Sequence, residues 1–347
     1  MLGPLIVDVA GTELSAEDRE VLMHPAVGGV ILFGRNCPDA DVVAALCAEI
    51  HALRDPRLLI TIDQEGGRVQ RLREGVTRLP PPARMGALWG SDPKAARALV
   101  RKAGWLMAAE LLALGVDLSF APVADLGGKS RVIGDRAFHH DPDAVEALAL
   151  AYVFGMREAG MRAVAKHFPG HGGVAGDTHV EEPVDRRAYA DLQMADLRPF
   201  EWLIGNGVAA VMMSHVVYPA VAAEPASLSR TWIQDILRNR LGFQGVVFAD
   251  DLSMRGVAGA GDMVARVSMA LEAGCDFAPI CNDREAVEAV LADSKRLPEE
   301  PASGLRRARL EPTEHLGRRA LHQDPRWQAA RESLARQAAG PDFELEG

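Results

Sequence analysis

LLITID, residues 58–63, decides the fold class of this chain, because five large or β-branched residues in a row end in a single carboxylate. A strand with one face in water alternates apolar and polar residues, whereas a continuous run is typical of a strand buried on both faces. The stretch therefore predicts a strand inside a covered parallel sheet, with Asp63 at its carboxyl end.

Seven further runs of the same kind occur along the chain. We expect the eight strands at residues 5–9, 29–33, 58–63, 116–121, 163–167, 209–215, 245–250 and 276–280. Between most of them the apolar spacing is helical, at 39–53, 93–112, 143–158, 187–205, 230–241 and 262–273. Asp39, Asp92 and Ser229 stand where N-caps are expected.

Eight strands that alternate with helices and end near residue 280 predict an α/β fold, a single-domain (β/α)8 TIM barrel over residues 1–295. An open doubly wound sheet is the alternative, since the number of strands alone does not prove that the barrel closes. No GxGxxG follows the first strand, which argues against the dinucleotide-binding form of that alternative.

Residues 296–347 form a separate region, which we expect to be a helical extension packed on the barrel with a loose tail. Its first part, 297–315, is rich in Pro, Arg and Glu, and we expect Arg306, Arg307 and Arg309 to lie on a solvated face. Pro325 starts a helical pattern, with Asp324 as the expected N-cap and Trp327 as an anchor onto the barrel.

Composition excludes several functional classes. The chain of 347 residues has 48% hydrophobic and 25% charged residues, and its net charge of −10 gives no general attraction to nucleic acid or anionic membranes. Its four cysteines form no CxxC pair, and the uncharged stretch 202–223 is broken by Gly, Asn, Ser, His and Pro. With no basic signal-like N-terminus, we expect a cytoplasmic monomer without nucleic-acid or membrane partners.

Polar residues gather where a barrel enzyme needs them, at the carboxyl ends of the predicted strands. Asp63 ends the third strand, and Lys166 and His167 end the fifth. His215 ends the sixth, and the Asp250–Asp251 pair ends the seventh. Charged groups at the ends of buried strands need a partner or a function.

The stretch KHFPGHGGVAGDTHV, residues 166–180, is the densest in candidate catalytic groups. A metal site of His167 and His171 would need both on one helical face, which Pro169–Gly170 makes unfavourable, so we expect no metal. The alternative is acid/base catalysis by His179, with Asp177 orienting its ring and tuning its pKa.

Two other stretches add carboxylates and guanidinium groups. IDQEGGRVQRL, residues 62–72, supplies Asp63 and Arg71 for sugar hydroxyls, while Glu65 and Arg68 fit a structural ion pair equally well. SRVIGDRAF contributes Arg136 after the fourth strand. In GVVFADDLSM, residues 245–254, one aspartate is a candidate nucleophile and the other a candidate helix cap, and strand alternation does not choose between them.

Four ordered blocks of this sequence resemble family 3 of the glycoside hydrolases, most closely its bacterial β-N-acetylglucosaminidases. The blocks are ITIDQEGGRVQRL, SRVIGDRAFHHDP, AVAKHFPGHGGVAGDTHV and VVFADDLSMRGV, spread from residue 60 to 257. The resemblance implies Asp250 as nucleophile, His179 as acid/base and Asp177 as its partner. It further implies sugar-binding roles for Asp63, Arg71, Arg136, Lys166 and His167.

The implied reaction is a retaining hydrolysis without a cofactor, through a covalent glycosyl-enzyme on Asp250. The implied substrate is a saccharide, N-acetylglucosamine linked β-1,4 to anhydro-N-acetylmuramic acid, with or without a peptide, from recycled cell wall. Because a neutral histidine base repels an anionic acceptor less than a carboxylate does, phosphorolysis is a possible side activity.

Three rival functions remain open on the residues alone. They are a non-catalytic sugar-binding barrel, a family relative with another sugar preference, and hydrolysis through the substrate's own acetamido group. One feature is also unfavourable for the eighth strand, because Pro279 removes a hydrogen-bond donor from it and puts regular pairing in doubt.

Overall fold

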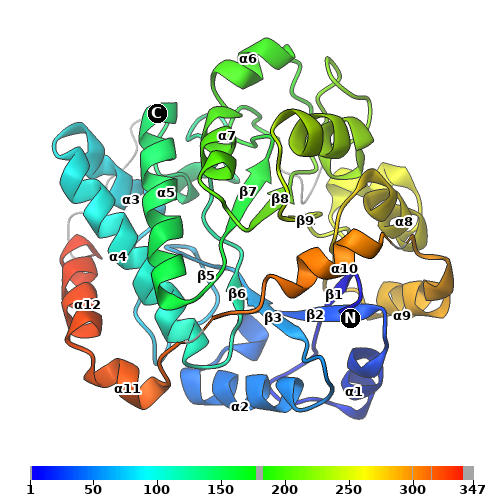
Figure 1. The fold of residues 1–347 in the computed structure, drawn as a ribbon, viewed down its shortest axis with the longest axis horizontal. Coiled ribbons are helices and arrows are strands. Elements are labelled where there is room, and N and C mark those ends of the chain that lie inside the picture. Colours follow the sequence, from blue (N-terminus) through cyan, green and yellow to red (C-terminus); the bar gives the residue numbers. More distant parts are fainter. Residues whose placement is uncertain (1, 177–182, 299, 314, 339–347) are drawn as a thin grey trace.

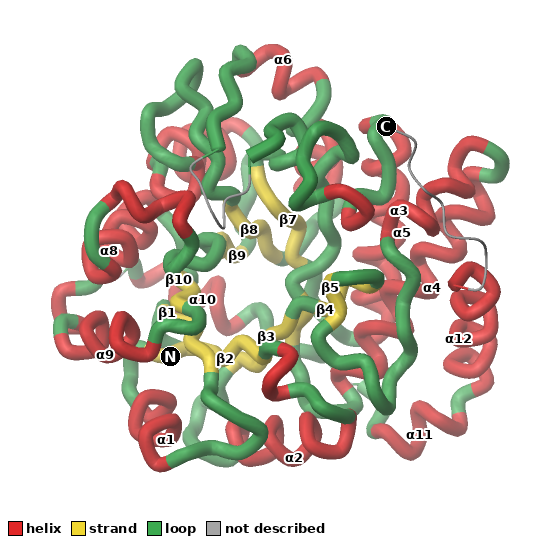
Figure 2. Tube along the Cα trace, turned by 180° about the vertical axis from the view of Figure 1, so that it is seen from behind, coloured by secondary structure: helices red, strands yellow, loops and turns green. Residues whose placement is uncertain are grey.

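Eight parallel strands form the centre of the structure, a computed structural model that describes residues 2–176, 183–298, 300–313 and 315–338. Each strand overlaps one of the eight predicted runs. They are β1 (Leu5–Asp8), β2 (Val27–Leu32), β3 (Leu59–Ile62), β6 (Leu118–Ser119), β7 (Val164–Phe168), β8 (Ala210–Met213), β9 (Val246–Phe248) and β10 (Ala278–Ile280). Figure 2 shows the strands gathered at the centre with the helices around them.

The barrel closes through two narrow junctions, which we call seams. Strand pairing gives a five-stranded sheet in the order β10-β1-β2-β3-β6 and a three-stranded sheet in the order β7-β8-β9. A single parallel bridge between Val123 and Lys166 joins the two sheets at one seam. A second bridge, between Phe248 and Phe277, joins them at the other. The ring of eight strands is therefore complete, which confirms the predicted barrel and not the open sheet.

Apolar side chains cover both faces of the strands. Inside the barrel, Phe248 contacts Phe120 and Phe277, with ring centroids 5.3 and 5.0 Å apart. A larger cluster fills the space between the strands and the helices. Burial on both faces explains why the strands read as continuous apolar runs in the sequence.

Helices follow most of the strands and form the outer layer (Figure 1). They are α1 (Ala16–Met23), α2 (Ala40–His51), α3 (Pro82–Gly86), α4 (Pro93–Leu112), α5 (Pro142–Ala159), α6 (Tyr189–Met194), α7 (Arg198–Gly205), a π-helix (Thr231–Arg240), α8 (Met263–Ala273) and α9 (Arg284–Ala292). Asp39 and Asp92 cap α2 and α4 as predicted, since their carboxylates accept from backbone N–H groups of the first turn.

Two helix predictions are corrected by the structure. The single helix expected at 187–205 is divided into α6 and α7, and Pro199 lies in the first turn of α7. A proline lacks the N–H that would continue a preceding helix, so it suits a new start. Ser229 is not an N-cap by its side chain, because its hydroxyl has no hydrogen-bond partner among the described residues, although its carbonyl accepts from Ile233 N at 3.0 Å.

Pro279 is tolerated in β10 because of the side on which its missing donor lies. Ala278 N donates to Pro4 O at 2.8 Å, and the register pairs Pro279 with Ile6 of β1. Neighbouring residues of a strand donate to opposite sides, so the absent N–H of Pro279 faces β9. On that side Pro279 still accepts a hydrogen bond at its carbonyl oxygen, from Leu252 N at 3.0 Å, so only the donor is missing.

The C-terminal region contains α10 (Pro301–Ala308), α11 (Arg318–Gln323) and α12 (Pro325–Ala338). Asp324 accepts from Arg326 N at 2.8 Å, as expected of an N-cap. Trp327 anchors α12, because it packs against the core and donates from Nε1 to Glu110 Oε1 of α4 at 2.9 Å. The PDFELEG tail, predicted to be loose, lies outside the described residues.

The expectation of a solvated face at 306–309 is wrong for two of its three arginines. Arg306 donates from Nε to Asp276 Oδ1 at 2.8 Å, and Arg307 donates from Nη1 to Asp276 O at 3.0 Å. Arg309 is exposed, as expected. Leu310, directly after α10, is buried and belongs to the cluster inside the barrel. α10 and Leu310 thus cover the amino end of the barrel.

No helix within the described ranges is long and apolar enough to cross a membrane. Cys37, Cys47, Cys275 and Cys281 are all buried and free of disulfides.

Candidate active site

A cavity of about 630 Å³ lies at the carboxyl end of the barrel strands. Its lining includes Asp63 after β3, Lys166 and His167 at the end of β7, and Asp250 after β9. Catalytic residues of (β/α)8 barrels lie at this end. The cavity is therefore the candidate active site, and the predicted strand-end residues meet in it.

Four charged side chains form a buried ion cluster along one wall of the cavity. Lys166 Nζ lies 2.8 Å from Asp63 Oδ1 and 2.6 Å from Glu65 Oε1. Arg136 donates two hydrogen bonds to the Glu65 carboxylate, both of 2.8 Å. Glu65 reaches this position because a short hairpin, β4 (Gln64–Gly66) with β5 (Val69–Gln70), begins directly after Asp63.

Mutual attraction keeps the cluster ionised. Burial raises the pKa of Asp63, but the charges of Lys166 and Arg71 outweigh it, and the pKa lies well below the usual range. Burial likewise opposes ionisation of Glu65, yet Arg136 and Lys166 lower its pKa to about 2. The same carboxylates raise the pKa of Lys166 against the effect of burial. The cavity wall is thus lined by fixed charges at neutral pH.

Asp125, in the loop after β6, holds His167 in one orientation. This fully buried carboxylate accepts from His167 Nδ1 at 2.6 Å and from His167 N at 3.1 Å, and its other oxygen accepts from His171 N at 2.7 Å. With its proton on Nδ1, the ring leaves Nε2 as an acceptor, 3.4 Å from Arg136 Nη2. Asp125 and Arg136 therefore fix the orientation of the His167 ring at the cavity wall.

The two aspartates after β9 differ in their surroundings. Asp251 accepts from Ser253 N at 3.0 Å, Ser253 Oγ at 2.7 Å and Cys281 N at 3.1 Å, and burial raises its pKa to about 6. Asp250 accepts at Oδ1 from Asp251 N at 2.9 Å. Burial opposes its ionisation, but nearby His215 and His167 bring its pKa below the usual value. Asp250 is thus the ionised carboxylate that lines the cavity with an oxygen not engaged by the described residues.

His215 fixes the backbone at Asp250 and Asp251. Its Nδ1 lies 2.7 Å from Ser227 Oγ, and its Nε2 lies 2.9 Å from the carbonyl oxygen of Asp251. A carbonyl only accepts, so Nε2 carries a proton and donates. The backbone that presents Asp250 is therefore fixed from the neighbouring strand β8.

The remaining predicted residues are placed as follows. Arg71 lines the cavity and donates from Nη2 to Asp63 Oδ2 at 3.3 Å. Glu65 and Arg68 do not pair with each other, because Arg68 donates to Asp135 Oδ1 at 2.9 Å. Asp177 and His179, the predicted acid/base pair, lie outside the described residues.

Sequence reasoning missed Asp125. A signal for it was present, since APVAD places a carboxylate four residues after the predicted fourth strand, as Asp63 ends the third. For a metal, the described segments contain no group of three or more His, Cys, Asp or Glu residues that could hold one. His167 and His171 lie with ring centroids 6.2 Å apart, and Asp125 binds the His167 Nδ1.

Comparison with known protein families identifies the class of protein to which this barrel belongs. Residues 4–303 match the N-terminal domain of glycosyl hydrolase family 3. The chain belongs to this family, and the expected enzyme class, a family 3 glycosidase of the β-hexosaminidase type, is confirmed.

Several relatives match most or all of the chain. A β-hexosaminidase of Alkalilimnicola ehrlichii is 53% identical over 349 residues, which cover 100% of this chain and 99% of the relative. One from Thiobacillus denitrificans is 58% identical over 292 residues, 84% of this chain and 81% of the relative. The crystal structure of NagZ from Neisseria gonorrhoeae in complex with N-trifluoroacetyl-D-glucosamine superimposes with a TM-score of 0.93 at 43% identity, covering 98% and 99% of the two chains.

Proposed function

We propose that this enzyme removes a β-linked N-acetylglucosamine from the non-reducing end of a saccharide with retention of configuration, using Asp250 as the nucleophile. The observation that carries the proposal is the position of Asp250, an ionised carboxylate at the cavity with one oxygen held by Asp251 N. The gonococcal relative, whose structure holds an N-acylated glucosamine, supports this class of sugar.

In the first step an oxygen of Asp250 attacks the anomeric carbon while the bond from that carbon to the leaving oxygen breaks. His179 donates a proton to the leaving oxygen. In the second step His179 takes a proton from water, the water oxygen bonds to the anomeric carbon, and the bond to Asp250 breaks. Asp177 is the partner that orients His179. These two roles rest on the sequence blocks shared with the family.

The cavity wall would hold the sugar while this happens. Asp63 is an acceptor for sugar hydroxyl groups, and Arg71, Arg136 and Lys166 are donors. Because the ion cluster and Asp125 fix these groups before the sugar arrives, binding costs little reorganisation.

We further propose that the natural substrate is N-acetylglucosamine β-1,4-linked to anhydro-N-acetylmuramic acid, with or without a peptide, in cell-wall recycling. This substrate follows from the resemblance of the four sequence blocks to the bacterial β-N-acetylglucosaminidases of the family.

The test measures nitrophenol release from 4-nitrophenyl β-N-acetylglucosaminide by the wild type, Asp250→Asn and His179→Ala. Asp250→Asn should fall to near background, because an amide cannot form the glycosyl ester. Asp235→Asn is the matched control, since Asp235 is exposed on the π-helix away from the cavity. Full activity of Asp250→Asn would refute the mechanism, and an inactive but folded wild type would refute the sugar specificity.

A second measurement separates covalent catalysis from attack by the substrate's acetamido group. A slow fluorinated glycosyl substrate should leave a sugar on the peptide that contains Asp250, detected by mass spectrometry. Absence of this adduct under turnover would favour the acetamido route. Product analysis in phosphate buffer shows in the same samples whether any sugar phosphate is formed.

A further inference from the structure

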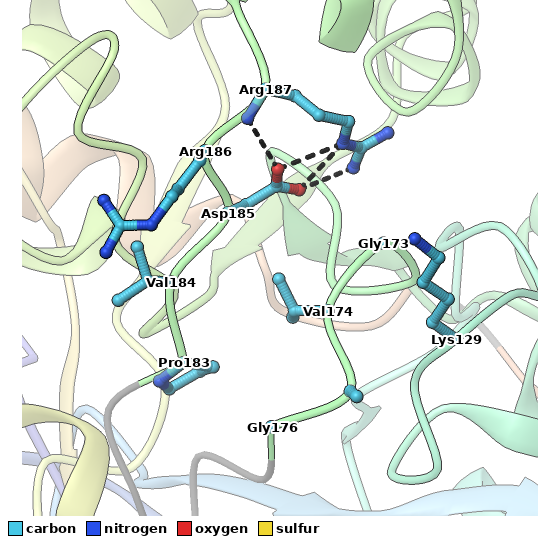
Figure 3. Close-up of a pocket in the computed structure, with 10 residues that line it drawn as sticks. Lys129, Gly173, Val174, Gly176, Pro183, Val184, Asp185, Arg186 and Arg187 are labelled. Atoms are coloured by element: carbon cyan, nitrogen blue, oxygen red, sulfur yellow. Dashed lines mark hydrogen bonds and ion pairs between the residues drawn. The ribbon is translucent and has the colours of Figure 1, made fainter.

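Most carboxylates at and near the cavity are paired with a cation or a histidine ring. The pairs are Asp63 and Glu65 with Lys166, Asp125 with His167 and, in a neighbouring pocket, Asp185 with Arg187 (Figure 3). Asp250 and Asp251 also line the cavity, but within the described part of the chain no cation lies at ion-pair distance from either. A carboxylate withdrawn from water without a cation is costly. The role of nucleophile accounts for Asp250, whereas Asp251 needs another explanation.

Neutral donors from two parts of the chain hold the Asp251 side chain. Its Oδ1 accepts from Ser253 N at 3.0 Å and from Cys281 N, directly after β10, at 3.1 Å, while its Oδ2 accepts from Ser253 Oγ at 2.7 Å. A capping role would need only the bonds to Ser253. The bond to Cys281 joins the turn after β9 to the neighbouring strand, so the side chain also fixes the position of this turn.

The backbone groups of Asp251 connect this turn to the nucleophile. Its carbonyl oxygen accepts from His215 Nε2 at 2.9 Å, and its N–H donates to Asp250 Oδ1 at 2.9 Å. Because the side chain and the carbonyl are both held, the N–H keeps its direction toward Oδ1. The other oxygen of Asp250, Oδ2, makes no hydrogen bond with the described residues and is available to a substrate.

We propose that Asp251 is a positioning residue that gives the two oxygens of Asp250 different roles, with Oδ1 held by the Asp251 N–H and Oδ2 forming the bond to the anomeric carbon. The inference rests on the proposed function, because it takes Asp250 as the nucleophile.

The two steps of the reaction then use the held oxygen differently. In glycosylation an electron pair of Oδ2 bonds to the anomeric carbon, the bond to the leaving oxygen breaks, the acid/base protonates that oxygen, and Oδ1 becomes the carbonyl oxygen of the ester. In hydrolysis the oxygen of water, which gives a proton to the acid/base, bonds to the anomeric carbon. The bond to Oδ2 breaks, and its electron pair returns to the carboxylate.

The Asp251 N–H therefore acts on the two steps in opposite senses. During glycosylation Oδ1 loses negative charge and its hydrogen bond weakens, whereas during hydrolysis the charge returns and the bond strengthens. A donor that binds the transition state more strongly than the ground state accelerates that step. Loosening Asp251 should thus slow hydrolysis of the glycosyl-enzyme more than its formation.

The test measures kcat and KM of Asp251→Ala and Asp251→Asn on 2,4-dinitrophenyl β-N-acetylglucosaminide. This leaving group needs little proton transfer, so hydrolysis of the glycosyl-enzyme should limit kcat, while kcat/KM reports glycosylation. In Asp251→Asn the amide oxygen takes the place of Oδ1 and the NH2 group donates to Ser253 Oγ, which keeps all three hydrogen bonds. Asp262→Ala is the matched control, because Asp262 caps α8 through Ala265 N in the same segment without contacting Asp250.

We expect kcat of Asp251→Ala to fall about tenfold and KM to fall as well, because the N–H remains but turns away from Oδ1. Asp251→Asn should restore most of the lost kcat, and the control should keep both constants. A purely structural role reduces the fraction of active enzyme, which lowers kcat and kcat/KM by the same factor and leaves KM unchanged. That result, or a wild-type kcat in Asp251→Ala, overturns the positioning role.

Ser253→Ala keeps the test decisive if Asp251→Ala does not fold. It removes only the hydroxyl bond to Asp251 Oδ2, so kcat and KM should both fall, by about threefold. Wild-type values of both constants in Ser253→Ala would then overturn the positioning role.

Failure of the proposed function gives a different pattern. A folded wild type that cleaves no β-N-acetylglucosaminide refutes that function and the positioning role with it. An active Asp250→Asn beside an inactive Asp251→Asn would make Asp251 the nucleophile, which refutes the positioning role while the glycosidase activity stands.

Discussion

Replacement of Asp125 by asparagine should uncouple the orientation of His167 from the rest of the site. The carboxylate accepts three hydrogen bonds, two from His167 and one from His171. An asparagine has one acceptor oxygen and an NH2 group, so at least one of the buried N–H groups would face another donor. A buried donor left unpaired costs about 1–3 kcal/mol, and the charge of the acceptor is lost as well. We expect the free energy of unfolding to drop by about 3 kcal/mol.

The same change should lower activity by a separate route. If the NH2 group faces His167 Nδ1, the ring proton moves to Nε2, and Nε2 then opposes the donor Arg136 Nη2 instead of accepting a hydrogen bond. The repelled Arg136 donor then no longer keeps its position for a sugar hydroxyl. Loss of one charged hydrogen bond to the sugar is worth about 2 kcal/mol, which is about a thirtyfold decrease in kcat/KM.

Asp276→Asn is the matched control for this experiment. Asp276 is also fully buried, and it accepts from Val247 N at 2.8 Å, Arg238 Nη2 at 2.9 Å and Ser303 Oγ at 2.6 Å, but at the amino end of the barrel. Urea unfolding should show a loss of stability for both variants, while only Asp125→Asn loses kcat/KM on the nitrophenyl glycoside. Wild-type kcat/KM in a folded Asp125→Asn, or an equal loss in the control, would refute the positioning role.

Three further predictions concern stability. Because the pKa of Glu65 is about 2 when folded and near its ordinary value of 4.5 when unfolded, the free energy of unfolding should fall by up to about 3 kcal/mol as pH drops from 4.5 to 2, and urea titrations of Glu65→Gln should lack this slope. Trp327→Leu loses its hydrogen bond to α4 and should cost about 2 kcal/mol in urea; an unchanged midpoint would contradict the anchor. A Cβ on Gly172 would lie 1.9 Å from Leu126 O, so Gly172→Ala should lower stability by about 3 kcal/mol, whereas Gly34→Ala, with no atom within 4 Å, should not.

The sequence was sufficient for the barrel because its signal is local. Strands buried on both faces show continuous apolar runs, and each run could be found without knowing its neighbours. The site followed from the same logic, because parallel strands bring Asp63, Lys166, His167 and Asp250 to one end of the barrel. The prediction of a single helix at 187–205 was wrong because a proline can either lie in a kinked helix or start a new one. The sequence alone does not show which of these applies to Pro199.

Pairing between distant residues could not be predicted in this way. Glu65 and Arg136 are separated by 71 positions, and the same residue types in another fold would be solvated. Arg306 shows the problem most clearly, since its run of arginines is typical of a solvated helix. Only the packing of α10 under the barrel, beside the buried Asp276, turns it into a structural ion pair.

The seam between β6 and β7 gives the candidate site a mechanical role. Asp63, Glu65 and Asp125 follow strands of the five-stranded sheet, and their partners Lys166 and His167 belong to the three-stranded sheet. The side-chain contacts that prepare the cavity for a sugar thus also join the two sheets, beside the Val123–Lys166 bridge. A competitive inhibitor that contacts both sheets should therefore slow amide hydrogen exchange along this seam. It should also raise the free energy of unfolding of variants in which the two sheets separate more easily.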